Sequence, residues 1–192
     1  MEKLKIAICG PSQIVDEEKK LAKNIGKGLI ESVGRDLLLV TGGTLGFPHE
    51  VITGTNRKAS VIAYPPVDAR WKALCGKAIG KLPWFGFGSL YDFIELTKGE
   101  DSRERASARI GRMLEGTPEM IAYLNLETRE TYEEIRRGGG LGIKRRVLVN
   151  MDNYSQIEDT LGAQSLLEGV ELYKDIDGLI SDLTNGVKNG KR

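Results

Sequence analysis

Short apolar runs alternate with amphipathic segments along the first third of the chain. The runs lie at residues 5–9, 37–40 and 60–64, and the segments between them, 16–33 and about 50–58, have apolar residues at helical spacing. Leu21 and Leu29, for example, fall on one helical face. This order predicts an α/β fold, a doubly wound and mostly parallel sheet with helices on both faces. Ligands of such sheets bind beyond the carboxyl ends of the strands.

The second half continues the alternation less regularly. The pattern predicts strands at 91–96, 120–124 and 146–150, and helices at 101–114, 128–137, 163–171 and 177–183. Three glycines at 138–140 should end the helix before them, and the polar tail 185–192 should be frayed. Residues 67–90 form an irregular insertion whose aromatic residues would cover a bound base, the sheet or a partner subunit. No linker divides the 192 residues, so we predict a single domain.

The composition excludes several classes of function. With 28 basic and 27 acidic residues the net charge is +1, which argues against a general electrostatic grip on nucleic acid or acidic membranes. Two cysteines and one histidine make no metal or disulfide spacing, so we predict no metal site. No apolar run approaches the ~20 residues of a membrane span. We therefore expect a cytoplasmic protein with no nucleic-acid or membrane partner.

The most informative segment is T-G-G-T-L-G-F-P-H at residues 41–49. Two glycines end an apolar strand, a third follows three residues later, and Pro48 suits the first turn of a helix. Glycine loops and helix N-termini bind anions through main-chain N–H groups. A turn that needs glycine only for tight packing is the second interpretation, and the complete order of strand, glycines and helix favours a phosphate site. With the loop after the first strand, the predicted binding residues are Gly10, Ser12, Gly42, Gly43, Thr44 and Gly46.

These segments resemble a known family. I-A-I-C-G-P-S at 6–12 and T-G-G-T-L-G-F-P-H-E-V-I-T-G at 41–54 are similar to the first strand and the phosphate loop of the Lonely Guy phosphoribohydrolases, Rossmann-like proteins once called lysine decarboxylases. The resemblance implies a Rossmann-like fold, a homodimer or higher oligomer, and hydrolysis of nucleoside 5′-monophosphates to free base and ribose 5-phosphate. The sequence offers no context for a pyridoxal-phosphate lysine, and we predict no cofactor.

The family's second motif, Pro-Gly-Gly-x-Gly-Thr-x-x-Glu, is altered here. Residues 126–134 read L-E-T-R-E-T-Y-E-E, which keeps the threonine as Thr131 and the final glutamate as Glu134 but none of the glycines. The resemblance implies that Thr131 contacts the nucleotide. It also implies that Glu134 acts at the ribose carbon with an arginine, best matched by Arg109, while Arg105 and Arg112 remain alternatives. A carboxylate suits this role because positive charge develops on the ribose. Taken singly, each of these side chains is equally well explained as part of a solvated helix surface.

Two functions therefore follow from the sequence. The retained Thr131 and Glu134 favour a hydrolase of nucleoside monophosphates. The glycines of the second motif are lost, and the carboxylates that replace two of its residues would repel a phosphate. Both changes favour a carrier or sensor that only binds a nucleotide or a nucleotide-like cofactor.

Overall fold

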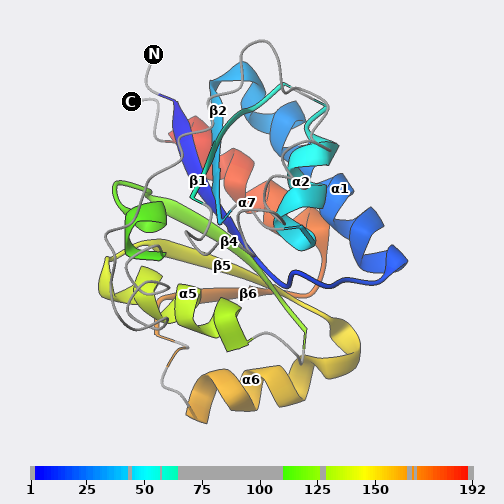
Figure 1. Cartoon of the computed structure of the whole chain (residues 1–192), viewed down its shortest axis with the longest axis vertical. Coiled ribbons are helices and arrows are strands. Elements are labelled where there is room, and N and C mark those ends of the chain that lie inside the picture. Colours follow the sequence, from blue (N-terminus) through cyan, green and yellow to red (C-terminus); the bar gives the residue numbers. More distant parts are fainter. Residues whose placement is uncertain are drawn as a thin grey trace, which may run out of the picture.

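The computed structural model describes residues 3–42, 45–56, 58–64, 110–125, 129–163, 166 and 168–189 (Figure 1). Its centre is a six-stranded sheet in the order β3-β2-β1-β4-β5-β6, in which all neighbouring strands are parallel. The strands are β1 (Leu4–Cys9), β2 (Leu37–Thr41), β3 (Ser60–Ala63), β4 (Glu119–Leu124), β5 (Lys144–Val149) and β6 (Val170–Tyr173). The order reverses direction between β1 and β4, as in a Rossmann fold. The predicted α/β doubly wound fold is confirmed.

Helices cover both faces of this sheet (Figure 1). They are α1 (Asp16–Val33), α2 (Phe47–Gly54), α5 (Arg129–Gly140), α6 (Tyr154–Ala163) and α7 (Ile176–Asn189). Alternate residues of each strand enter two separate cores, as Ile6 and Ile8 of β1 face α1, α2 and α7 while Ala7 and Cys9 face α5 and α6. This alternation follows from the two-residue period of a strand. All described strands join one sheet, and the single-domain organisation remains a prediction.

Glycines bring α1 and α2 into backbone contact. A Cβ atom on Gly26 would lie 1.9 Å from the carbonyl oxygen of Val51, and one on Gly54 would lie 2.1 Å from the carbonyl oxygen of Lys23. Both distances are far below any real carbon–oxygen contact, so only glycine allows the helices to cross this closely. The contact fixes the position of α2, whose start lies at the carboxyl edge of the sheet.

Several predicted boundaries in the second half are wrong. A helix was predicted over 163–171. Instead, helix α6 covers residues 154–163, and residues 170–173 form the edge strand β6. A strand of four partly buried residues is too short to show a period, and it is specified by pairing with β5. α7 continues to Asn189, and the fraying predicted for the tail 185–192 stays a prediction.

α5 extends through Gly138 and Gly139 and ends at Gly140, so the three glycines form its last turn, whereas the predicted helix ended at residue 137. A Cβ atom on Gly139 would lie 2.7 Å from Nη1 of Arg145, so this glycine also makes room for the arginine side chain. In the first half, α2 starts at Phe47 and ends at Gly54, earlier than the predicted 50–58. Three predictions lie wholly or mostly outside the described residues: the strand 91–96, the insertion 67–90 and the helix 101–114. Of that predicted helix, only residues 110–114 are described, and they are helical.

Candidate functional site

The two predicted glycine loops meet at the carboxyl edge of the sheet. Gly10 and Ser12 follow β1, Gly42 follows β2, and the paired ends of these strands lie side by side. The N–H of Phe47, the first residue of α2, donates to the carbonyl oxygen of Pro11 at 2.9 Å. The structure therefore brings together the two segments from which the sequence predicted a phosphate site. Gly43 and Thr44 of that prediction lie outside the described residues.

Close packing explains two of the glycines. Gly46 has φ +103°, and a Cβ atom there would lie 2.2 Å from the carbonyl oxygen of Pro11 and 2.6 Å from Cα of Ser12. A Cβ atom on Gly10 would lie 2.8 Å from the ring of Phe47. Tight packing, the second interpretation of the motif, thus accounts for glycine at both positions. The same packing brings the backbone of the first loop against the start of α2.

The donors of α2 are partly committed. The Phe47 N–H is bound to Pro11, and Pro48 in the first turn has no N–H. The first two residues of α2 therefore have no main-chain N–H left for an anion at this edge.

A buried carboxylate that was not predicted from the sequence lies at the start of α1. Glu18, in the first turn of α1, accepts hydrogen bonds from the Tyr123 hydroxyl at 2.8 Å, the Asn125 amide at 3.2 Å and the Val15 N–H at 3.0 Å. The ring of Tyr123 stacks on Phe47 with centroids 4.8 Å apart. These contacts join the starts of α1 and α2 to the end of β4, across the point where the strand order reverses.

The chemistry of Tyr123 fits this arrangement. Burial, and then the hydrogen bond and charge of Glu18, raise the pKa of the Tyr123 hydroxyl. The hydroxyl therefore stays protonated and donates to the carboxylate. One sequence signal for the network exists, because a glutamate three residues after a helix N-cap commonly accepts the N-cap N–H. The partners from β4 have no such signal.

The retained residues of the second motif are buried on α5. Thr131 is 1% exposed and Glu134 is 6% exposed, one helical turn apart, while their neighbours Tyr132 and Ile135 enter the core. Glu134 is therefore no solvated surface carboxylate. Its neighbour Glu133 is exposed and pairs with Arg136 at 2.8 Å.

The arginine partner proposed for Glu134 is not located. Arg105 and Arg109 lie outside the described residues, as do residues 126–128 of the altered motif. Arg112 is described and exposed, and its guanidinium lies 3.5 Å from the carboxylate of Glu115, three residues further along the chain. Among the described residues, no group of three histidine, cysteine or acidic side chains is arranged to hold a metal ion. In the same part of the chain, no helix is both long and apolar enough to span a membrane.

Comparison with known proteins shows the fold but not the family. No protein-family model matches the chain, and no curated protein matches it. Among solved structures, a molybdenum cofactor binding protein from Rippkaea orientalis is 17% identical, with a TM-score of 0.68 over 97% of this chain and 99% of that one. The molybdenum cofactor carrier protein of Chlamydomonas reinhardtii is 17% identical, with a TM-score of 0.60 over 96% and 98%.

DNA processing protein A from Helicobacter pylori, which binds single-stranded DNA, is 18% identical, with a TM-score of 0.67 over 96% of this chain and 82% of that one. At these identities the likeness extends to the fold alone. The chain has a Rossmann-like fold of the kind used by molybdenum cofactor carrier proteins.

Proposed function

We propose that this protein binds a nucleotide or a nucleotide-like cofactor at the carboxyl edge of its sheet and acts as its carrier or sensor. The observation that carries the proposal is the contact of the two predicted loops, in which Phe47 donates to Pro11 and Gly46 packs on Ser12. The edge lies next to the reversal of strand order, where ligands of such sheets bind. The fold is shared with molybdenum cofactor carriers, so this cofactor is the first natural ligand to test.

The anion site is tested by placing a negative charge in the first loop. Ser12 is exposed and its backbone adjoins Gly46, so Ser12→Asp adds a charge beside a bound phosphate without filling the core. We expect at least a tenfold loss of AMP affinity in calorimetry. Ser181→Asp, the same change on the exposed surface of α7, is the control and should alter affinity less than twofold. Equal affinities of the two variants would reject the site.

Hydrolysis of nucleoside monophosphates is the second candidate function. It is favoured by the burial of Glu134, because a carboxylate shielded from water acts more strongly on the positive charge that develops on a ribose. Thr131, one turn before it, would contact the nucleotide, and Arg109 would act with Glu134. The loss of the motif's glycines favours the carrier instead.

The two functions differ in the release of base. If the protein is a hydrolase, Glu134→Gln should retain AMP binding and slow adenine release by a factor on the order of a hundred. Glu133→Gln is the matched control, since Glu133 is exposed on the same turn of α5. Tight AMP binding by the wild-type protein without adenine release above the uncatalysed rate would leave the carrier function alone.

The partner predictions can also be tested directly. A homodimer or higher oligomer, implied by the family resemblance, should sediment at twice the 21.1 kDa chain mass or more at micromolar concentration. A small-molecule ligand without nucleic-acid binding is expected from the balanced charge. Because one protein of this fold binds single-stranded DNA, an oligonucleotide should be included in the binding assays.

A further inference from the structure

We propose that the hydroxyl group of Tyr173 is a pH-sensitive switch at the edge of the sheet. It donates its single hydrogen to Asp182 of α7 when that carboxylate is ionised, and to Glu171 of β6 when Asp182 carries a proton. The switch is independent of the proposed function, since it lies at the edge strand β6, three strands away from β1 and its loop.

Tyr173 connects the edge strand to the C-terminal helix. Its ring lies against α7, where a Cβ atom on Gly178 would be 3.7 Å from Cδ1 of the ring. Its hydroxyl oxygen is 2.7 Å from Oδ2 of Asp182, one helical turn further along, and 2.9 Å from Oε2 of Glu171. Burial, and then the contacts with these two carboxylates, raise the pKa of Tyr173, so the hydroxyl keeps its hydrogen.

The hydroxyl has one hydrogen for two acceptors. Ionised carboxylates accept hydrogen bonds and donate none. Both distances are in the range of O–H···O hydrogen bonds, yet Tyr173 can direct its hydrogen at only one of the two carboxylate oxygens. The other contact then joins two oxygens with no hydrogen between them, and it is repulsive while both carboxylates are ionised. A proton that one carboxylate takes up from the solvent turns this contact into a second hydrogen bond.

The surroundings of Glu171 decide which carboxylate takes up the proton. Oε1 of Glu171 is 2.9 Å from Nζ of Lys144, and Oε2 is 3.5 Å from Nε of Arg146. Burial raises the pKa of Glu171, but hydrogen bonds from Lys144 and Tyr173 and the two positive charges lower it below its usual value. Within the described part of the chain, no cation pairs with Asp182. The proton therefore goes to Asp182, and Glu171 stays ionised.

Arg146 offers Glu171 a second partner. The arginine is 1% exposed, and its Nε atom makes no hydrogen bond with any group that the structure describes. Oε2 of Glu171, the same oxygen that contacts the Tyr173 hydroxyl, lies 3.5 Å from this Nε. A buried N–H without an acceptor destabilises a fold. A small movement of Glu171 towards Arg146 would give this N–H its acceptor.

Each protonation state of Asp182 therefore has its own set of hydrogen bonds. With Asp182 ionised, Tyr173 donates to Asp182, and Glu171 accepts from Nε of Arg146. With a proton on Asp182, the acid donates to the Tyr173 oxygen, Tyr173 donates to Glu171, and Nε of Arg146 has lost its acceptor. The distances in the structure match the second set. The proton thus exchanges a side-chain bond between β5 and β6 for a chain of bonds that ends on α7.

Other charges around the switch have partners of their own, so they compete little for the Tyr173 hydroxyl. α7 packs on α1 where a Cβ atom on Gly28 would lie 3.0 Å from Cδ1 of Ile180. Asp177, in the first turn of α7, is exposed. The paired groups are Lys27 with Glu31 next to Gly28 on α1 (3.9 Å), Asp175 with the N–H of Gly178 (2.8 Å), Lys144 with Glu171 (2.9 Å) and Glu119 with Arg146 (2.5 Å).

In proton–nitrogen NMR spectra, the Nε–H signal of Arg146 reports the position of the switch. Asp182→Ala removes one acceptor, so Tyr173 donates to Glu171 at pH 7, and the proton signal of the Arg146 Nε–H should move upfield because its hydrogen bond is lost. Lowering the pH of the wild-type protein from 7 to about 4, where Glu171 with its lowered pKa is still ionised, should move the signal in the same direction. Asp177→Ala is the matched control on α7 and should leave the signal in place at pH 7.

Tyr173→Phe removes the switch and keeps the ring. Glu171 then has Lys144 and Arg146 as its described donors, so the Nε–H signal should stay at its pH 7 position down to about pH 4. An unchanged signal in Asp182→Ala, or a wild-type pH response in Tyr173→Phe, would overturn the switch. If circular dichroism shows that Tyr173→Phe is unfolded, the comparison of Asp182→Ala with Asp177→Ala decides alone.

Discussion

The two halves of the sheet are stabilised by different kinds of contact. In the β1–α1–β2–α2 half, backbones touch at glycines, as at Gly54 against Lys23 and Gly46 against Pro11. In the β4–β5–β6 half, buried arginines of β5 reach neighbouring carboxylates and carbonyls, as Arg146 does to Glu119 at 2.5 Å. Close backbone contact permits only one residue type and thus leaves a mark in the sequence. Side-chain pairing across strands leaves none that one sequence can show.

Removing the buried arginine should have the largest effect. Arg146 is 1% exposed and lies between Glu119 and Glu171. Arg146→Ala leaves a cavity and an unpaired, mostly buried Glu119, and we expect it to lower the free energy of unfolding by about 3–5 kcal/mol. Urea titration at pH 7 measures this. Arg136→Ala, which breaks an exposed pair with Glu133, should cost less than about 1 kcal/mol.

A double variant separates lost pairing from lost volume. Arg146→Ala leaves the Glu119 carboxylate without its arginine partner. Adding Glu119→Gln should therefore recover part of the stability, and the losses caused by the two single substitutions should not be additive. Additive losses would mean that the pair contributes little and that the second half, like the first, depends on packing.

The backbone contact of the first half should be nearly as sensitive. A methyl group on Gly54 would lie 2.1 Å from a carbonyl oxygen of α1, and the two helices would have to separate. We expect Gly54→Ala to cost about 2–3 kcal/mol in thermal or urea unfolding. Gly140→Ala, in open space within α5, is the matched control and should be neutral or stabilise by up to about 1 kcal/mol. If both variants behave alike, the glycine contact is not what holds α2.

The same difference explains what the sequence could predict. The α1 boundaries and the positions of the first three strands along the chain were predicted correctly, because glycine, proline and regular periodicity mark them. The edge strand β6 was missed because its four residues acquire their structure from β5. The space that Gly139 leaves for Arg145 was not predicted, because Arg145 comes from the following strand.

The candidate site also has one part that was predicted from the sequence and one that was not. The glycine loops were visible in the sequence, and the structure brings them together at Phe47 and Pro11. The contacts of Glu18 with Tyr123 and Asn125 were not visible, because Glu18 lies more than a hundred residues before both and meets them only after the sheet has formed.

The pH-dependent contribution of Glu171 to stability should be smaller than the effects of Arg146→Ala and Gly54→Ala. Burial raises the pKa of Glu171, but hydrogen bonds from Lys144 and Tyr173 and the charges of Lys144 and Arg146 outweigh it and lower the pKa below its usual value. A lowered pKa stabilises the fold above the unfolded value of about 4.3, and this contribution is lost as the pH falls through the lower folded value. Because Glu171 is partly exposed, we expect Glu171→Gln to cost no more than about 1 kcal/mol at pH 7.

The measurement is urea unfolding of wild type and Glu171→Gln at several pH values. The difference between them should be constant from pH 7 to about pH 5 and should vanish towards pH 3. Glu158→Gln, on the exposed surface of α6, controls for the general effect of losing one carboxylate. A difference that persisted at pH 3 would mean that Glu171 acts through packing rather than through its charge.

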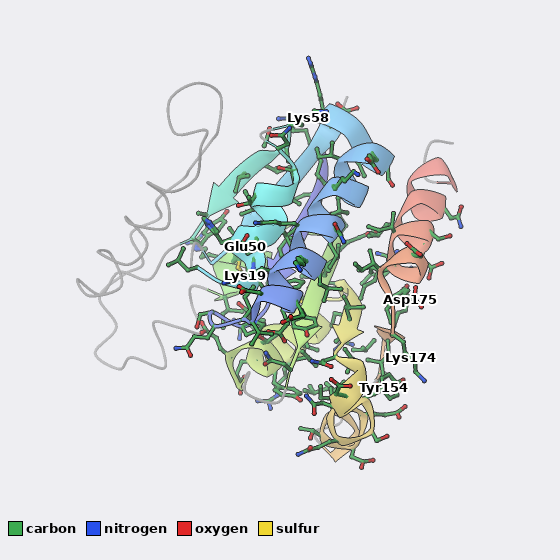
Figure 2. The ribbon with its side chains drawn as sticks, turned by 90° about the vertical axis from the view of Figure 1, so that its right-hand side faces the viewer. Lys19, Glu50, Lys58, Tyr154, Lys174 and Asp175 are labelled. Carbon is green, nitrogen blue, oxygen red and sulfur yellow. The ribbon has the colours of Figure 1, made fainter. Side chains whose placement is uncertain are left out.

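The smallest expected effect is at the carboxyl edge of the second half. Nζ of Lys174, just after β6, lies 4.2 Å from the ring centroid of Tyr154, the first residue of α6, and Figure 2 shows the two residues together. A partly exposed cation–π contact contributes about 0.5–1 kcal/mol. We expect a coupling of this size in a double-mutant cycle of Lys174→Gln with Tyr154→Leu, measured by urea unfolding. Lys58→Gln, an exposed lysine of the first half, should show no coupling with Tyr154→Leu. A coupling near zero would mean that α6 is positioned by its apolar residues Ile157 and Leu161 alone. The contrast between the two halves would then hold only away from the carboxyl edge.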